Sequence, residues 1–347
     1  MMRAKPIQSP LQGERVVGLT PAPAARVTDW NRRLNLFAGR ALTSSALTAE
    51  QKGHSGRLAL RGQAVSPGVV QGLEISLIAQ GDTPYLHIAS GFGIAASGED
   101  VFVPKPVRIA LGSLPVFTTA ALLDGVADSG TGELAPRRAG PPLAELPAKN
   151  NAVPGVGVIV LQPVNVDELA NFDPSDQCEE DPEDDAFSDE QWLDGCRILY
   201  YAWPTEWLPL PAAGDAWRNR LAYAIFEAEG ANDPDQVMPW ELAGLPIAMV
   251  AFDEDWTPLF ADRYAVVREG GKPRRRAPIV DEAGNEFLNQ ARILQFADHL
   301  ASLDRSAPAA EFIKEFRYLP PAGLLPISVL KLASDASAEN RVTGSDF

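Results

Sequence analysis

The sequence predicts a mainly β protein of the α+β class, and three observations lead to this expectation. Glycine (28) and proline (30) together make up about a sixth of the 347 residues, which favours many short elements joined by turns. Apolar residues reach 46%, enough to build a core. One stretch, 286–303, places Ile293, Phe296, Leu300 and Leu303 at the spacing of a helix with one buried face.

Changes in composition divide the chain into five parts. Residues 1–30 read as an extended arm, and 31–112 as a small module of helix and short strands. A loop or linker rich in Pro and Gly is expected over 113–152, where aromatic and β-branched clusters are scarce. A larger β-rich domain follows over 153–330, and 331–347 is a polar tail.

The arm and the helix after it are read from local signals. Four prolines interrupt residues 1–30 and favour extended backbone, so the arm is either a flexible terminus or a segment that orders on a neighbouring subunit. A helix is expected from about Leu42, with Thr48 and Gln51 forming a capping box. Gly53 and Gly56 weaken such a helix by about 1 kcal/mol each, so it needs packing partners.

The remaining elements follow from apolar alternation and turn residues. Two β-prone runs, 153–163 and 197–203, are expected to pair with each other, with an acidic loop over 173–190 inserted between them. A helix is expected over 216–230 and a hairpin from 247–252 and 259–267. Four further short strands are expected at 69–78, 85–90, 101–104 and 107–111.

The charge pattern bears on partners. The net charge is −16 and the pI about 4.7, which disfavours broad binding to nucleic acid or to anionic membranes. Much of the excess lies in 173–190, which has ten acidic residues and no Lys or Arg. This loop is interpreted as a solvated loop, as a ligand set for a hard cation, or as a contact for a basic segment of a neighbouring copy.

The compartment is judged from cysteines and apolar runs. Only Cys178 and Cys196 occur, so a disulfide scaffold is not expected, although a bridge closing the acidic loop stays open beside two unpaired thiols. No run approaches the ~20 apolar residues of a membrane span, and the N-terminus lacks the apolar stretch of a signal peptide. The protein is expected to stay in the cytoplasm until release.

Motifs for chemistry are weak in this chain. Gly91-x-Gly93-x-x-Ala96 matches a relaxed dinucleotide fingerprint, but a strand and not a helix is expected next, so tight turns explain the glycines. The three histidines are scattered, which leaves a triad assembled across the fold as an unsupported alternative. No cofactor, metal site or catalytic residue is predicted. The tryptophans are expected mostly in the core, with Trp207 as an exposed contact.

Two stretches resemble one family. The segments Phe37–Thr43, Leu47–Gln51, Pro67–Glu74 and Ile88–Asp100 occur in an order that resembles an N-terminal module of baseplate and tail-periphery proteins of contractile phage tails and phage-tail-like injection systems. Phe316-Arg-Tyr-Leu-Pro-Pro-Ala-Gly-Leu-Leu-Pro looks like a second signature of these proteins. The chain departs from the pattern at Ser90 and at Ala96-Ser97. The resemblance implies a non-catalytic structural role and carries over no active-site residue.

The expected function is therefore assembly: a structural subunit of a contractile injection particle, with several copies in contact with other baseplate or tail subunits. Extended segments would make these contacts by strand addition or wrapping. Two alternatives remain: a surface adhesin or carbohydrate-binding module, and a hydrolase with a scattered triad. The candidate contact residues are basic residues of the arm and of the 274–276 stretch, acids of the acidic loop and one tryptophan: Arg3, Lys5, Arg15, Arg26, Arg274, Arg275, Arg276, Glu179, Glu180, Asp184, Asp185 and Trp207.

Overall fold

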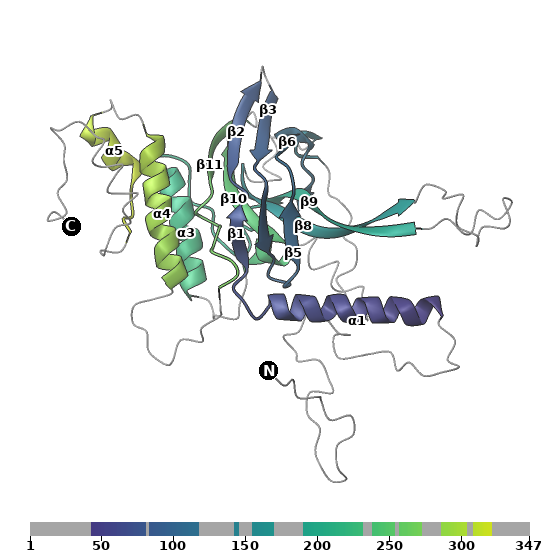
Figure 1. Ribbon diagram of the computed structural model, residues 1–347. Coiled ribbons are helices and arrows are strands. Elements are labelled where there is room, and N and C mark those ends of the chain that lie inside the picture. Colours follow the sequence, from purple (N-terminus) through teal and green to yellow (C-terminus); the bar gives the residue numbers. More distant parts are fainter. Residues whose placement is uncertain are drawn as a thin grey trace, which may run out of the picture.

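A computed structural model describes residues 43–80, 83–117, 142–145, 155–169, 190–231, 238–253, 257–272, 286–303 and 308–320. Within these residues, eleven strands form three sheets and a smaller number of helices lie around them (Figure 1). This architecture confirms the predicted α+β, mainly β class. The predicted division into domains stays a prediction. One hydrophobic core contains residues from both sides of the proposed linker.

The largest sheet has five strands in the order β11-β10-β8-β9-β7. Its centre is the antiparallel pair β8 (Val156–Leu169) and β9 (Glu190–Ala202), which confirms the predicted pairing of the two β-prone runs. β10 (Leu245–Phe252) and β11 (Pro258–Asp262) continue the sheet on one side, and β7 (Val116–Phe117) pairs in parallel on the other. All eight residues of β10 are buried, as expected for a continuous apolar run inside a sheet.

β8 and β9 are longer than the sequence predicted, and their outer parts leave the sheet. β10 pairs with β8 only as far as Leu161, and β7 pairs with β9 only at Tyr200 and Tyr201. β8 and β9 nevertheless stay paired with each other out to Leu169 and Glu190. We call residues 162–169 and 190–197, which pair with each other, the ribbon arm; it projects from the body in Figure 1.

Two three-stranded sheets are built from the N-terminal part. The expected strand at 69–78 is wrong as a single element, because the chain breaks at Gly72 and Leu73, whose φ values are 66° and 56°. Two successive left-handed residues turn the chain from one sheet into the next. The sheets have the orders β1-β4-β5 and β2-β3-β6, with β1 Gly68–Gly72, β2 Ile75–Gln80, β3 Thr83–Ile88, β4 Gly91–Ile94, β5 Asp100–Val103 and β6 Val107–Ala110.

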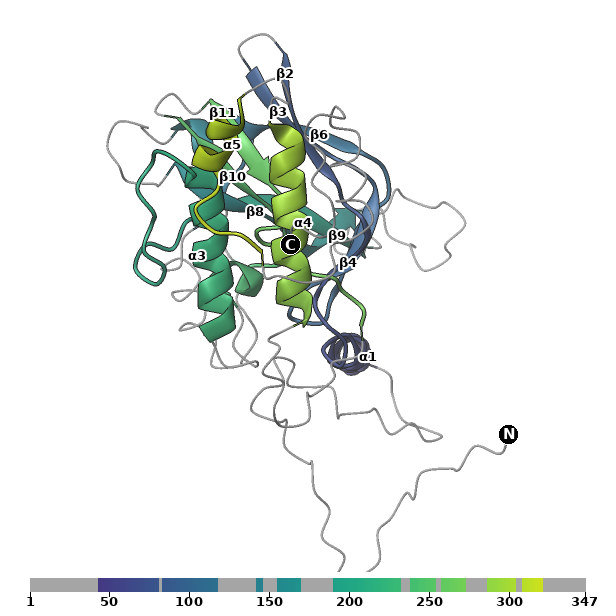
Figure 2. The ribbon, with the colours of Figure 1, turned by 90° about the vertical axis from the view of Figure 1, so that its left-hand side faces the viewer.

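Helices α3 (Trp217–Ala231) and α4 (Glu286–Ser302) pack side by side beside the large sheet (Figures 1 and 2). Both lie within one residue of their predicted ranges. The predicted buried stripe of α4 is wrong, because its four residues are only partly buried. The fully buried face instead carries Leu288, Ala291, Gln295 and His299, and two of these are polar. The face is rotated because it packs against a buried charge on α3, described below.

Helix α1 (Ser44–Gly62) precedes the small sheets, and α5 (Ala309–Glu315) follows α4. α1 begins earlier than the capping-box prediction requires. Its N-cap is Thr43, whose Oγ1 accepts a hydrogen bond from the Ala46 amide at 3.3 Å, while Thr48 lies inside the helix. The earlier threonine therefore satisfies the amides of the first turn.

Candidate functional site

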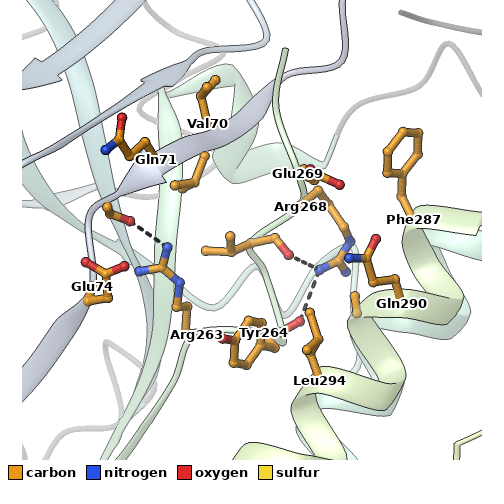
Figure 3. A pocket seen from close by; sticks show the side chains of 14 residues that line it. Val70, Gln71, Glu74, Arg263, Tyr264, Arg268, Glu269, Phe287, Gln290 and Leu294 are labelled. Atoms are coloured by element: carbon orange, nitrogen blue, oxygen red, sulfur yellow. Dashed lines mark hydrogen bonds between the residues drawn. The ribbon is translucent and has the colours of Figure 1, made fainter. Parts of the chain in front are cut away.

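An arginine joins the large sheet to the N-terminal strands. The chain leaves β11 in a turn that aims Arg263 at the break between β1 and β2, as Figure 3 shows. Its two terminal nitrogens donate hydrogen bonds to the carbonyl oxygens of Leu73 and Gly72, the second at 2.7 Å. Burial lowers the pKa of the Arg263 guanidinium, and the nearby Glu74 carboxylate opposes this change. Arg263 therefore holds the left-handed turn through its backbone.

The segment after Arg263 closes the outer side of β1. The Val69 amide donates to the Arg268 carbonyl at 3.0 Å, and the Gly270 amide donates to the Val69 carbonyl at 3.0 Å. Ser66 extends this closure, since its amide donates to the Lys272 carbonyl at 2.8 Å. Gly68 has a φ of 140°, and a Cβ there would lie 2.2 Å from the Arg268 carbonyl oxygen. Only glycine fits this approach.

A pocket of about 240 Å³ lies between β1, the 263–269 turn and α4 (Figure 3). Its wall includes Arg268, whose Nε donates to Glu229 at 3.0 Å and whose terminal nitrogens donate to backbone carbonyls of its own turn. Arg263 is likewise bonded to the backbone. Both guanidinium groups of the pocket are thus engaged in holding the turn.

Helix α1 is fastened to the β4–β5 turn by two glycines. A Cβ at Gly62 would lie 1.9 Å from the Gly98 carbonyl oxygen, and one at Gly98 would lie 1.9 Å from the Ala59 carbonyl oxygen. The Gln63 amide group reinforces the joint by donating to the Ser97 carbonyl at 2.7 Å. Gly98 also has a φ of 86°, which disfavours any side chain.

A buried ion pair connects α3, β11 and α4. Arg218 Nε donates to the Asp262 carboxylate at 2.7 Å, and the same guanidinium donates to Asp298 at 2.6 Å and to the Ser302 hydroxyl at 3.0 Å. Asp262 is fully buried and also accepts from Gln295 at 2.9 Å and from the Ala265 amide at 3.0 Å. The carboxylate is therefore satisfied on all sides, as a buried charge must be.

His299 lies beside this ion pair. Burial, followed by the charge of Arg218, lowers the pKa of His299 to about 4, so its ring is neutral at pH 7. Among the described residues its Nδ1 has no hydrogen-bond partner, and its Nε2 is 3.6 Å from the Glu315 carboxylate. The Ser302 hydroxyl donates to the backbone carbonyl of His299 and not to the ring. His54 and His87 lie in α1 and β3.

The start of the second signature, Phe316–Pro320, is held against α3. The buried Asn219 side chain accepts from the amides of Arg317 at 2.9 Å and Tyr318 at 2.8 Å, and donates to the Tyr318 carbonyl at 3.1 Å. The Tyr318 ring stacks on Tyr223 at 5.0 Å between centroids. Phe316 packs at 4.6 Å from the His299 ring. This signature is therefore a docking sequence for the protein's own helix.

The predicted contact residues are mostly outside the described residues. Of the twelve, the structure places only Trp207, which is half-buried and packs against the core, so it is less exposed than predicted. Trp203 and Trp240 are buried, which confirms the core interpretation for them. Cys196 is half-buried, and burial raises the pKa of its thiol; its pairing with Cys178 stays a prediction, since Cys178 is not described.

Sequence reasoning missed the residues that organise the fold: Arg263, Arg218, Asp262 and Asn219. Each acts on a partner at least 40 residues away in the sequence, and no local pattern marks such pairs. Among the described residues, no three His, Cys, Asp or Glu side chains are placed to hold a metal ion. No helix in the same part of the chain is long and apolar enough to cross a membrane.

Among the comparisons with known proteins, only the comparison with solved structures finds a similarity. No family model matches the chain, and no curated protein matches it. Among solved structures, "Crystal structure of TssK" is similar, with 13% identity and a TM-score of 0.26. The match covers 90% of this chain and 63% of TssK, so the chain spans less than two thirds of that protein's length.

Proposed function

We propose that this protein is a non-catalytic structural subunit of a contractile injection particle, in its baseplate or at the tail periphery. It acts through contacts with other subunits of the particle and needs no cofactor. It is made in the cytoplasm and leaves it as part of the assembled particle. The sequence resemblance described above supports the kind of particle.

The observation that carries the proposal is the ribbon arm. Residues 162–169 of β8 pair with β9 but with no other described strand. An isolated two-stranded ribbon is marginally stable in water, and its open edges are templates for further strands. Such an arm serves little purpose in a monomeric enzyme, whereas it suits a subunit that binds neighbours by strand addition.

The placement of the resembling residues also supports a structural role. Gly68, Gly72, Gly91 and Gly98 all belong to the stretches that carry the resemblance, and each lies where a Cβ would meet backbone atoms closer than 3 Å. These glycines therefore set packing geometry between strands and helix. Together they fix how β1 meets β4 and the 268–270 segment, and how α1 meets the β4–β5 turn.

Co-purification tests the proposal. The tagged full-length chain is expressed in its native host during particle production, and particles are isolated by sedimentation under gentle conditions. The protein is expected in the particle fraction, at a fixed ratio to sheath, spike or wedge proteins. Recovery of the chain only as a free monomer, with none of these proteins captured after crosslinking, contradicts the proposal.

A further inference from the structure

We propose that the ribbon arm of one copy binds the basic segment 272–276 of a second copy, by adding that segment as a strand to the open edge of β8. This inference rests on the proposed structural role and names the partner surface. It depends on three features: the edge of β8 that continues beyond the end of β10, the negative charge beside that edge, and the most basic segment of the chain.

The open edge of β8 is continuous with an existing interface. β10 occupies this edge along Val156–Leu161, with Leu245 opposite Leu161. Before Leu245 the chain turns away into a short 3-10 helix, Pro239–Leu242. The next eight residues of β8, 162–169, therefore keep the same edge with no described strand beside it. An added strand would lie in line with β10 and extend the sheet.

Charge decides which strand can bind. The 163–196 stretch holds 13 acidic residues and no Lys, Arg or His, which leaves 33 acidic and 30 basic residues elsewhere. Asp167 and Glu168 lie in the part of β8 that has the open edge, and Glu190 lies opposite Leu169 on β9. Charges on an edge strand prevent pairing with a copy of itself, because like charges opposite each other are destabilising. The occupant must therefore be basic.

The chain contains one segment of matching charge. Lys272, Arg274, Arg275 and Arg276 give four basic residues within five positions, with no acidic residue between Glu269 and Asp281. Pro273 and Pro278 favour extended backbone in the residues before them, as an added strand requires. The segment begins beside β1, where the Ser66 amide holds the Lys272 carbonyl at 2.8 Å. The Lys272 side chain is 51% exposed and forms an ion pair with Glu269 of its own copy at 2.9 Å.

The two surfaces are different parts of the molecule, so the contact is head-to-tail. The ribbon arm leaves the large sheet (Figure 1), whereas Lys272 is bonded to Ser66, just before β1. In a pair joined by one such contact, one copy keeps a free basic segment and the other keeps a free ribbon arm. Further copies can add at both ends, which builds rings or open chains.

A charge-swap experiment tests this inference with the full chain. One variant carries Asp167→Lys, Glu168→Lys and Glu190→Lys, and the other carries Arg274→Glu, Arg275→Glu and Arg276→Glu. Sedimentation velocity is measured at tens of micromolar protein in about 50 mM and about 500 mM salt. The wild type is expected to form species larger than a dimer at low salt, with at least tenfold weaker association at high salt.

Each variant alone is expected to be monomeric, because the 162–169 edge and the basic segment then have the same sign. An equimolar mixture is expected to recover association, since every arm then faces an opposite segment. Slowed amide exchange in 162–169 in the associated sample identifies strand addition rather than charge attraction alone. The matched control Glu206→Lys, Asp215→Lys and Glu227→Lys alters charge equally at exposed positions and is expected to keep association.

A wild type that stays monomeric at low salt overturns the inference, as does a mixture that stays monomeric while both variants unfold at the wild-type temperature. Association that persists in both single variants overturns it as well. These outcomes are separable from the proposed function. If the protein is monomeric but still enters particles, the structural role stands and the ribbon arm binds another protein. If it self-associates but does not enter particles, the contact is supported and the structural role is contradicted.

Discussion

Arg263 donates a hydrogen bond to the backbone carbonyl of Leu73, a buried residue with a φ of 56°. A bulky residue in the left-handed region costs of order 1–3 kcal/mol, so surrounding contacts must hold it there. The arginine supplies one of them, and it does so across 190 residues of sequence. Arg263 is thus one of the contacts that fix the small sheets to the large sheet.

The first prediction concerns this point. Arg263→Ala removes both hydrogen bonds to the turn and is expected to lower the free energy of unfolding by about 1.5–3 kcal/mol. Arg263→Lys, which retains the charge without the fork of donors, is expected to recover only part of the loss. Urea unfolding measures both, with the exposed Lys105→Ala as control, expected within about 0.5 kcal/mol of wild type. An Arg263→Ala variant with the same free energy of unfolding as the wild type would contradict this role.

The second prediction tests the joint of α1. Gly98→Ala places a Cβ against the Ala59 carbonyl at a positive φ, and is expected to destabilise the protein by at least about 2 kcal/mol or to detach α1. Gly195→Ala is the matched control, because nothing lies within 4 Å of its Cβ position. Amide exchange in 55–62 and thermal unfolding report the two effects. Equal behaviour of both variants would show that the contact does not hold the helix.

The third prediction compares two carboxylates on the same guanidinium. Asp262 is fully buried, whereas the Asp298 side chain is 46% exposed. Asp262→Ala leaves Arg218 without its buried partner and is expected to cost about 3–5 kcal/mol. Asp298→Ala is expected to cost under about 1 kcal/mol, because water screens that pair. Denaturant unfolding of both variants provides the comparison, and similar losses would contradict the difference in burial.

The fourth prediction concerns pH. Folding lowers the pKa of His299 from 6.5 to about 4 through burial, so the unfolded chain binds an extra proton between these values. Stability from this residue is therefore full above about pH 6.5 and is lost as the pH falls towards 4. His299→Gln is expected to flatten the stability profile in this window relative to wild type. The exposed His54→Gln is the control, and an unchanged slope in His299→Gln would refute the assignment.

The sequence was sufficient where the signal was local. The ranges of α3 and α4 and the pairing of β8 with β9 follow from apolar spacing and β-branched runs. The sequence was insufficient where a residue distant in the chain determines the local structure. Nothing near residue 73 reveals that Arg263 will hold a left-handed leucine, and the buried face of α4 is set by Arg218 on another helix. Tertiary contacts of this kind override local pattern.

The same holds for the candidate surfaces. Composition identified an acidic stretch and a basic stretch. The ribbon arm, however, depends on how far β8 continues beyond the residues that pair with β10, and only the pairing register shows this. The Phe316 signature was noticed as a pattern, while its role as ligand of Asn219 needed the fold.

The closure of β1 by residues 268–272 has a consequence for biogenesis. A nascent chain that has emerged only as far as β10 already contains all strands of the small sheets, yet it lacks both the arginine at 263 and the segment that covers β1. The small sheets, whose last strand ends at Ala110, are therefore sealed along β1 only when Lys272, 162 residues later, has been made. Translation must pass residue 272 before this half of the protein stops being a target for chaperones.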